Sequence, residues 1–139
     1  RDWGHAKDYV EMQWMMLQQE KPEDFIIASG HQHSVRDFIN IAAKEVGMTI
    51  IWEGEGENEK GFWVDEKNSQ NKKLIIIVNK KFYRPTEVHS LLGDSSKAIK
   101  MLEWKQKYSF RQLVAEMINY DLEMAREEKL LIDNFPKNK

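Results

Sequence analysis

Two arginines stand at element boundaries, in runs that could bind a phosphorylated ligand. Arg1 opens the run RDWGHAKDYV just before a helical pattern, and Arg84 lies in the run FYRPTEVHSLLGDSSKA just before a strand pattern. A guanidinium presents a rigid fork of donors that matches phosphate oxygens, so two of them suit a pyrophosphate. Arginines also occur in surface ion pairs, which are common and contribute little. The spacing therefore indicates either a diphosphate site or a pair of surface salt bridges.

Other polar residues are weaker candidates for chemistry. His31 and His33 could share one side of an extended segment, but the sequence places no third ligand beside them, so we expect no metal site. Asp2 and Asp8 could act as general acids or bases. Asp8, however, falls in the first turn of a predicted helix, where the helix dipole already favours a carboxylate. Structural roles are the better interpretation of all of these side chains.

Two further features bear on a ligand site. The tryptophans are scattered through different predicted elements and most should belong to the core, but Trp3 lies beside Arg1 and is expected near a ligand. The segment from Gly54 to Gly61 has the glycines of a phosphate cradle. Its glutamates would repel a phosphate, so it is interpreted as a solvated loop.

The composition is that of an ordinary soluble globular protein. The chain has 139 residues, 41% of them hydrophobic and 32% charged, and a net charge of −2 gives no reason to expect nucleic acid or an anionic membrane as partner. The absence of cysteine excludes disulfides and thiolate catalysis and is compatible with a cytoplasmic location. No apolar run approaches the ~20 residues of a membrane span. Because the chain opens on Arg1 without methionine, we expect a fragment of a larger protein.

Helical periodicity and capping residues predict four helices. Pro22 closes the first, which covers residues 5–19; Ser34 caps the second, over 35–46; Asp94 can cap a short third over 95–103; and a capping box, SFRQ, opens the fourth over 110–124. Apolar residues expected to face the core recur along each longer helix: Ala6, Val10, Trp14 and Leu17; Val35, Phe38, Ile39, Ala42 and Val46; Phe110, Leu113, Val114 and Met117.

Short apolar runs predict strands between the helices. These runs are residues 25–29, 49–53, 62–64, 74–78 and 88–92, with 25–29 and 74–78 expected to be buried and the polar residues 68–73 expected to form a turn. The elements alternate as α/β without an internal repeat. No glycine-rich turn joins a first strand to a helix, so the chain carries no dinucleotide-binding fingerprint of its own.

In combination, these runs closely resemble the GDP-mannose 4,6-dehydratase family of the extended short-chain dehydrogenase/reductase superfamily. The resemblance covers residues 1 to about 126 and rests on RDWGHAKDYV, PEDFIIASG, HSVRDFINIAAKEVG, FYRPTEVHSLLGDSSKA and LEWKQKYSFRQLVAEM, in this order. It implies an α/β fold: the C-terminal substrate-binding part of an NAD(P)-binding Rossmann-like enzyme. Residues 1–133 would form this part with the last Rossmann-like elements, and residues 134–139 a frayed tail.

The resemblance also implies an activity for the complete protein. Such a lyase converts GDP-mannose to GDP-4-keto-6-deoxymannose with tightly held NADP, the entry step to GDP-fucose, and is expected to be a homo-oligomer, a dimer or a tetramer. The family's cofactor fingerprint, its Tyr-x-x-x-Lys pair and its catalytic Thr and Glu all precede the position of Arg1. We therefore expect the catalytic residues and most of the NADP site to lie upstream of this chain.

Individual site residues follow from the same resemblance. Arg1 matches the arginine of the family's RDW run and Arg84 that of its RPTEV run, and in related enzymes such arginines hold the substrate diphosphate. Glu87 matches the acidic residue of RPTEV and is a candidate for hydrogen bonds to the nucleotide or its ribose. The chain departs from the family at Asn79, where an aspartate is expected.

Two other functions fit the residues. One is a different nucleotide-sugar dehydratase or epimerase, which a preference for another nucleotide would reveal. The other is a non-catalytic sugar-nucleotide-binding module, which an upstream strand–glycine-rich turn–helix would exclude.

Overall fold

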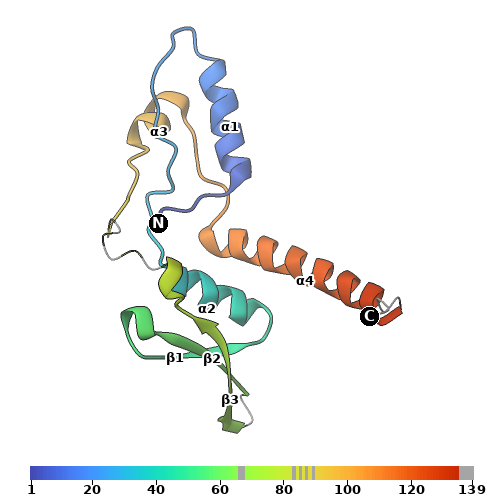
Figure 1. Cartoon of the computed structure of the whole chain (residues 1–139). Coiled ribbons are helices and arrows are strands. Elements are labelled where there is room, and N and C mark those ends of the chain that lie inside the picture. Colours follow the sequence, from blue (N-terminus) through green and yellow to red (C-terminus); the bar gives the residue numbers. More distant parts are fainter. Residues whose placement is uncertain (66–67, 83, 85, 87, 89, 135–139) are drawn as a thin grey trace.

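The computed structural model describes residues 1–65, 68–82, 84, 86, 88 and 90–134, and Figure 1 shows a mixed α/β arrangement. The order of the elements is α1 (Ala6–Leu17), α2 (Val35–Glu45), β1 (Thr49–Glu53), β2 (Lys60–Asp65), β3 (Asn68–Ile77), α3 (Ser96–Leu102) and α4 (Phe110–Asn134), with short 3₁₀ turns at Gly56–Asn58 and Lys80–Phe82. The three strands follow one another along the chain, so the predicted alternation of helix and strand is wrong although the α/β class holds.

The strands form one antiparallel sheet in the order β1-β2-β3. Ile51 lies opposite Phe62, and Phe62 lies opposite Leu74, while irregularities at Gly61/Phe62 and at Val64/Asp65 shift the register between β2 and β3. In Figure 1, α2 lies against this sheet at one end of the molecule, α1 and α3 lie together at the other, and α4 extends outward from the region between them. The N-terminus, which carries Arg1, lies in that middle region.

The most buried apolar cluster lies between α1 and α3. Met12 and Ala98 are fully buried, and Leu102 and Trp104 complete the cluster. The methionines Met15 and Met16 and the extended residues Phe25 and Ile27 pack around it. This cluster holds α1 in place and therefore fixes the loop that precedes it, which carries Arg1.

The prediction of the buried face of α1 is wrong. Val10 and Leu17 are 63% and 82% exposed, and Trp14 is also exposed, whereas Met12 is completely buried. Helix α1 carries apolar side chains on two sides, and the methionine side packs on α3. Periodicity detects an apolar stripe but does not indicate which of two stripes meets the neighbouring helix.

The predicted starts of α2 and α4 are confirmed. The Ser34 Oγ accepts the Asp37 N–H at 3.0 Å while Asp37 Oδ2 accepts the Ser34 N–H at 2.8 Å, a complete capping box. Ser109 and Gln112 form the equivalent pair at α4, with 2.8 Å from Ser109 N to Gln112 Oε1. Helix α4 continues ten residues beyond the predicted end at 124, to Asn134.

Burial along these two helices follows the prediction only in part. Phe110 and Val114 are buried as expected, but Val35 and Met117 are exposed. Helical periodicity therefore predicted some, but not all, of the buried positions on these helices. The short helix α3 is confirmed, and Asp94 Oδ1 accepts the N–H of its first residue, Ser96, at 2.9 Å.

Several strand predictions are wrong. Residues 25–29 are not a strand, nor are the described residues of 88–92, whereas the predicted turn at 68–73 is the first half of β3. Leu74, Ile75 and Ile77 are exposed rather than buried, and β3 pairs only with β2 among the described strands. A strand needs a neighbour to pair with, and an apolar run alone does not supply one.

Candidate substrate-binding site

Arg1 lies where three distant segments of the chain meet. Its main-chain nitrogen donates to the His33 oxygen at 2.8 Å, and its main-chain oxygen accepts from the His33 nitrogen at 2.9 Å. Its side chain extends the other way, where Nη1 donates to the Val88 oxygen at 3.1 Å. The first predicted run is therefore in direct contact with the second.

Asp2 anchors the backbone directly after Arg1. Its Oδ1 accepts the N–H of Ser29 at 2.9 Å and the hydroxyl of Ser29 at 2.5 Å, and its Oδ2 accepts the N–H of Gly30 at 3.0 Å. Partial burial acts to raise the pKa of Asp2, but these bonds and a main-chain bond from Gly93 outweigh it and lower the pKa below its usual range. Asp2 is thus an ionised structural anchor, in agreement with the structural interpretation of the sequence.

A close approach of Ala28 to Gly93 packs the loop that Asp2 binds against the second run. A Cβ added to Gly93 would lie 2.3 Å from the Cβ of Ala28, which no real structure allows. Ala28 itself is buried. The glycine of the LLGD run is therefore needed because residue 28 occupies the space where a side chain would be.

Trp3 belongs to an aromatic cluster at the start of α4. Its ring stacks on Phe110 with 5.5 Å between centroids and meets the edge of Phe38 at 5.8 Å. His33 stacks on Phe110 at 3.9 Å. Trp3 therefore packs α2 and α4 together beside the Arg1 backbone, and its predicted position near a ligand stays a prediction.

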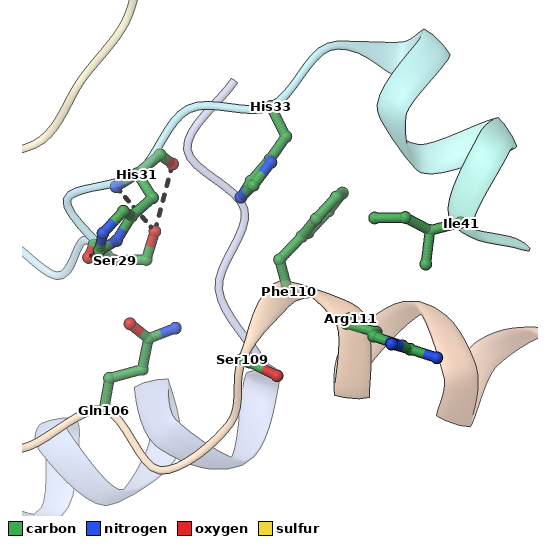
Figure 2. A pocket seen from close by; sticks show the side chains of 8 residues that line it. All are labelled: Ser29, His31, His33, Ile41, Gln106, Ser109, Phe110 and Arg111. Carbon is green, nitrogen blue, oxygen red and sulfur yellow. Dashed lines mark hydrogen bonds between the residues drawn. The ribbon is translucent and has the colours of Figure 1, made fainter.

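A cavity of about 360 Å³ adjoins this cluster. Figure 2 shows the rings of His33 and Phe110 side by side along it, with Arg111 close by on the first turn of α4. Its lining comprises Ser29, His31, His33, Ile41, Gln106, Ser109, Phe110 and Arg111. Neither Arg1 nor Trp3 lines the cavity, so it neighbours the arginine runs without containing them.

The structure places the remaining predicted site residues as follows. Arg84 is exposed and lies in the second run, four residues before the Val88 carbonyl that Arg1 contacts. Glu87 lies outside the described residues, so its role stays a prediction. Among the described residues, no group of three or more His, Asp or Glu side chains is placed to hold a metal ion. No helix in this part combines the length and apolarity of a membrane span.

Sequence analysis missed His5, which is buried at the start of α1. Its Nδ1 accepts the N–H of Lys7 at 3.1 Å, and its Nε2 lies 3.1 Å from Oε2 of Glu116 on α4. Because Nδ1 accepts, the ring proton is assigned to Nε2, which donates to the carboxylate. Lys7 first and His5 second lower the pKa of Glu116. The only sequence signal was a histidine at a helix start.

Asp8, in the first turn of α1, is a buried carboxylate that also anchors the backbone. Its two carboxylate oxygens accept the N–H groups of Lys107 and Tyr108, each at 3.1 Å. Its main-chain oxygen accepts from Nε1 of Trp104 at 3.2 Å. These bonds tie α1 to the segment that leads into α4, so the carboxylate serves the fold, as the sequence favoured.

Comparison with known proteins extends along nearly the whole chain. The family model described as GDP-mannose 4,6 dehydratase matches residues 1–117. A GDP-mannose 4,6 dehydratase of Dictyostelium discoideum is 53% identical over 126 residues, which cover 91% of this chain and 34% of that protein. The human protein of the same name is 49% identical over 91% of this chain and 32% of its own length.

A bacterial relative gives the same result. The GDP-mannose 4,6-dehydratase of Vibrio cholerae is 47% identical over 136 residues, covering 94% of this chain and 37% of the relative. The chain thus spans about a third of the length of the curated relatives that it matches.

Proposed function

This chain belongs to the GDP-mannose 4,6-dehydratase family, and we propose that it forms the C-terminal, substrate-binding part of an enzyme converting GDP-mannose to GDP-4-keto-6-deoxymannose. One observation carries the proposal beyond the family membership. The hydrogen bond from Arg1 to the Val88 oxygen joins the RDW run to the run that contains Arg84. Residues that a diphosphate would need at one place therefore come from segments in contact.

In this proposal, Arg1 and Arg84 hold the diphosphate of the GDP-sugar. A guanidinium has five N–H donors, so Arg1 can keep its bond to Val88 and still present donors to phosphate oxygens. Glu87 would accept hydrogen bonds from the nucleotide or its ribose. Trp3 would hold the neighbouring backbone of Arg1 in place through its stacking on Phe110.

The described residues do not fit a dinucleotide cofactor. The glycine-rich turn that follows β1, from Gly54 to Gly56, leads through the 3₁₀ turn Gly56–Asn58 into the strand β2 instead of into an α-helix. A pyrophosphate site of the Rossmann type needs that helix. In the proposal, NADP and the acid–base residues belong to the remainder of the enzyme, and this chain contributes binding and orientation of the substrate.

A chimera tests the proposed function. Residues 1–126 replace the matching segment of the Dictyostelium relative, and formation of the 4-keto sugar from GDP-mannose is followed by chromatography. We expect turnover within about tenfold of the parent enzyme, because differences outside the reacting centre alter positioning more than chemistry. A folded chimera that neither binds nor converts GDP-mannose would refute the assignment. Conversion of a different nucleotide-sugar would favour a related dehydratase or epimerase.

A further inference from the structure

One short loop binds both oxygens of the carboxylate that follows Arg1. Asp2 accepts hydrogen bonds from Ser29 and from Gly30, and the preceding residue, Ala28, lies directly against Gly93. Ser29 and Gly30 directly follow Ala28 in the chain, and Gly93 belongs to the run that also contains Arg84. Asp2 thus binds the RDW run to a loop that packs against the second run, independently of the bond from Arg1 to Val88.

We propose that Asp2 is the positioning residue of the diphosphate site: its carboxylate fixes the backbone of Arg1 and holds the RDW and RPTEV runs together. The inference rests on the proposed function, and it adds a residue that need not touch the substrate. Asp2 would act through Arg1, whose guanidinium makes the contact.

The geometry leaves Arg1 little backbone freedom. On one side, residue 1 pairs with His33 in both directions, at 2.8 and 2.9 Å. On the other, Asp2 is held by Ser29 and Gly30, three to four residues before His33. The backbone of residues 1 and 2 is therefore bound at both ends to the loop of residues 29–33. These bonds fix the direction in which the Arg1 side chain leaves the backbone.

The close approach of Ala28 and Gly93 makes this loop a stable support. The Cβ of Ala28 fills the space where a side chain at position 93 would lie, so this loop and the second run are in close contact. Asp2 binds the loop through Ser29 and Gly30, which directly follow Ala28. Removing its charge should therefore change the position of Arg1 relative to the second run.

Catalysis by Asp2 itself is a poor alternative. Both oxygens are engaged by donors, one of them the Ser29 hydroxyl at 2.5 Å, so neither is available to remove a substrate proton. A carboxylate stabilised in its ionised form is also a poor proton donor at neutral pH. Positioning is what this arrangement of donors can perform.

Asp2→Asn is the informative variant. An amide keeps one acceptor oxygen, but its NH₂ group would face an N–H of Ser29 or Gly30, so one side of the anchor becomes repulsive. A misplaced Arg1 guanidinium would make a weaker charge-assisted contact with the phosphate oxygens. We expect GDP-mannose binding to weaken roughly tenfold.

The matched control is Asp37→Asn. Asp37 is likewise a capping carboxylate that binds a serine hydroxyl and a main-chain N–H and has a lowered pKa, but it belongs to the capping box of α2. The substitution Asp37→Asn should lower the melting temperature about as much as Asp2→Asn while leaving the affinity for GDP-mannose unchanged. A general loss of stability would affect both variants alike.

Calorimetry on the chimera separates the possible outcomes. If Asp2 acts through Arg1, Asp2→Asn weakens binding roughly tenfold in the parent but adds little in an Arg1→Ala background. An equal effect in both backgrounds, or unchanged binding by Asp2→Asn while Arg1→Ala binds weakly, would overturn positioning. Unchanged binding by Arg1→Ala and Arg84→Ala would instead contradict the proposed function itself.

The 139-residue chain gives a readout that needs no ligand. In a pH titration followed by nuclear magnetic resonance, the amide protons of Ser29, Gly30 and Gly93 should shift with one midpoint, below the ordinary pKa of an aspartate. Asp2→Asn should abolish that transition at all of them, and the milder Ser29→Ala should move it upward. Amides that titrate separately, or not at all, would show that Asp2 does not join these segments.

Discussion

The Nη1 of Arg1 donates to the main-chain oxygen of Val88 at 3.1 Å, across 87 positions of the sequence. This bond places Arg1 in contact with the run that contains Arg84. Neither run alone would form the proposed site, because each supplies one arginine and the two runs meet only after the chain has folded.

The isolated 139-residue chain should neither bind NADP nor convert GDP-mannose. It has no strand–glycine turn–helix unit and no Tyr-x-x-x-Lys pair. Incubation with GDP-mannose and NADP, followed by detection of 4-keto sugar, checks this. Turnover above a heat-treated control would show that the sequence carries catalytic residues of its own.

Two substitutions on α1 test which of its faces is buried. Met12→Ala should lower the free energy of unfolding by ~2–5 kcal/mol, because it removes a fully buried side chain from the cluster with Ala98. Val10→Ala, on the exposed face, should change it by less than about 0.5 kcal/mol. Urea titration of both variants of the chain provides the measurement. Similar losses would mean that both faces are packed.

The His5 side chain should stabilise α1 as an N-cap. His5→Ala removes the acceptor for the Lys7 N–H and the donor to Glu116, so we expect a loss of about 1 kcal/mol or somewhat more in unfolding free energy. His5→Asn should recover the capping part, since asparagine is a favourable N-cap. Equal stability of both variants in thermal unfolding would argue against a capping role.

The lowered pKa of Asp2 predicts a specific dependence of stability on pH. Because the folded pKa lies below the ordinary 3.8, the carboxylate contributes stability above that value and loses it as the pH falls through the folded pKa. The difference in unfolding free energy between the parent and Asp2→Asn should therefore shrink below about pH 4. A difference that stays constant down to pH 2 would contradict this linkage.

Local signals in the sequence predicted the beginnings of the helices well. Ser34 and Ser109 each start a capping box whose partner lies three residues away, so the information is contained in a few neighbouring residues. The buried side of α1 was beyond such reasoning, because Met12 is selected by its contact with α3, some ninety residues later. Tertiary contacts decide which apolar stripe faces inward.

The strand predictions likewise succeeded where neighbouring residues decide the structure and failed where pairing with another strand decides it. Residues 49–53 were predicted correctly because their β-branched and aromatic residues suit a pleated strand. The polarity of residues 68–73 favoured a turn. These residues belong instead to β3, which pairs with β2 and lies at an edge of the sheet, where polar residues are common. Pairing with a neighbour outweighed local composition.

Of the candidate site, the sequence indicated the two arginines but not what holds them. The partners of Asp2 lie 27 and 28 positions away, and no local pattern contains them. The stacking of His33 on Phe110 likewise joins residues from separate elements. Family resemblance indicated which residues to expect at the site, and the folded chain shows how Arg1 is held.

Binding of GDP-mannose to the Arg84 variants of the chimera tests the central claim most directly. A charge-assisted hydrogen bond contributes ~1.5–3 kcal/mol, so Arg84→Ala and Arg1→Ala should each weaken binding roughly ten- to a hundredfold. Arg84→Lys should recover only part of the loss, because an ammonium cannot make the paired contact. The control Arg126→Ala, on the exposed part of α4, should bind like the parent.

Calorimetry at matched ionic strength gives the decisive comparison. The account predicts weak binding by both Arg1→Ala and Arg84→Ala, with the affinity of Arg126→Ala unchanged. Parent-like affinity for GDP-mannose in both arginine variants would contradict it and would make Arg1 and Arg84 ordinary surface ion-pair residues.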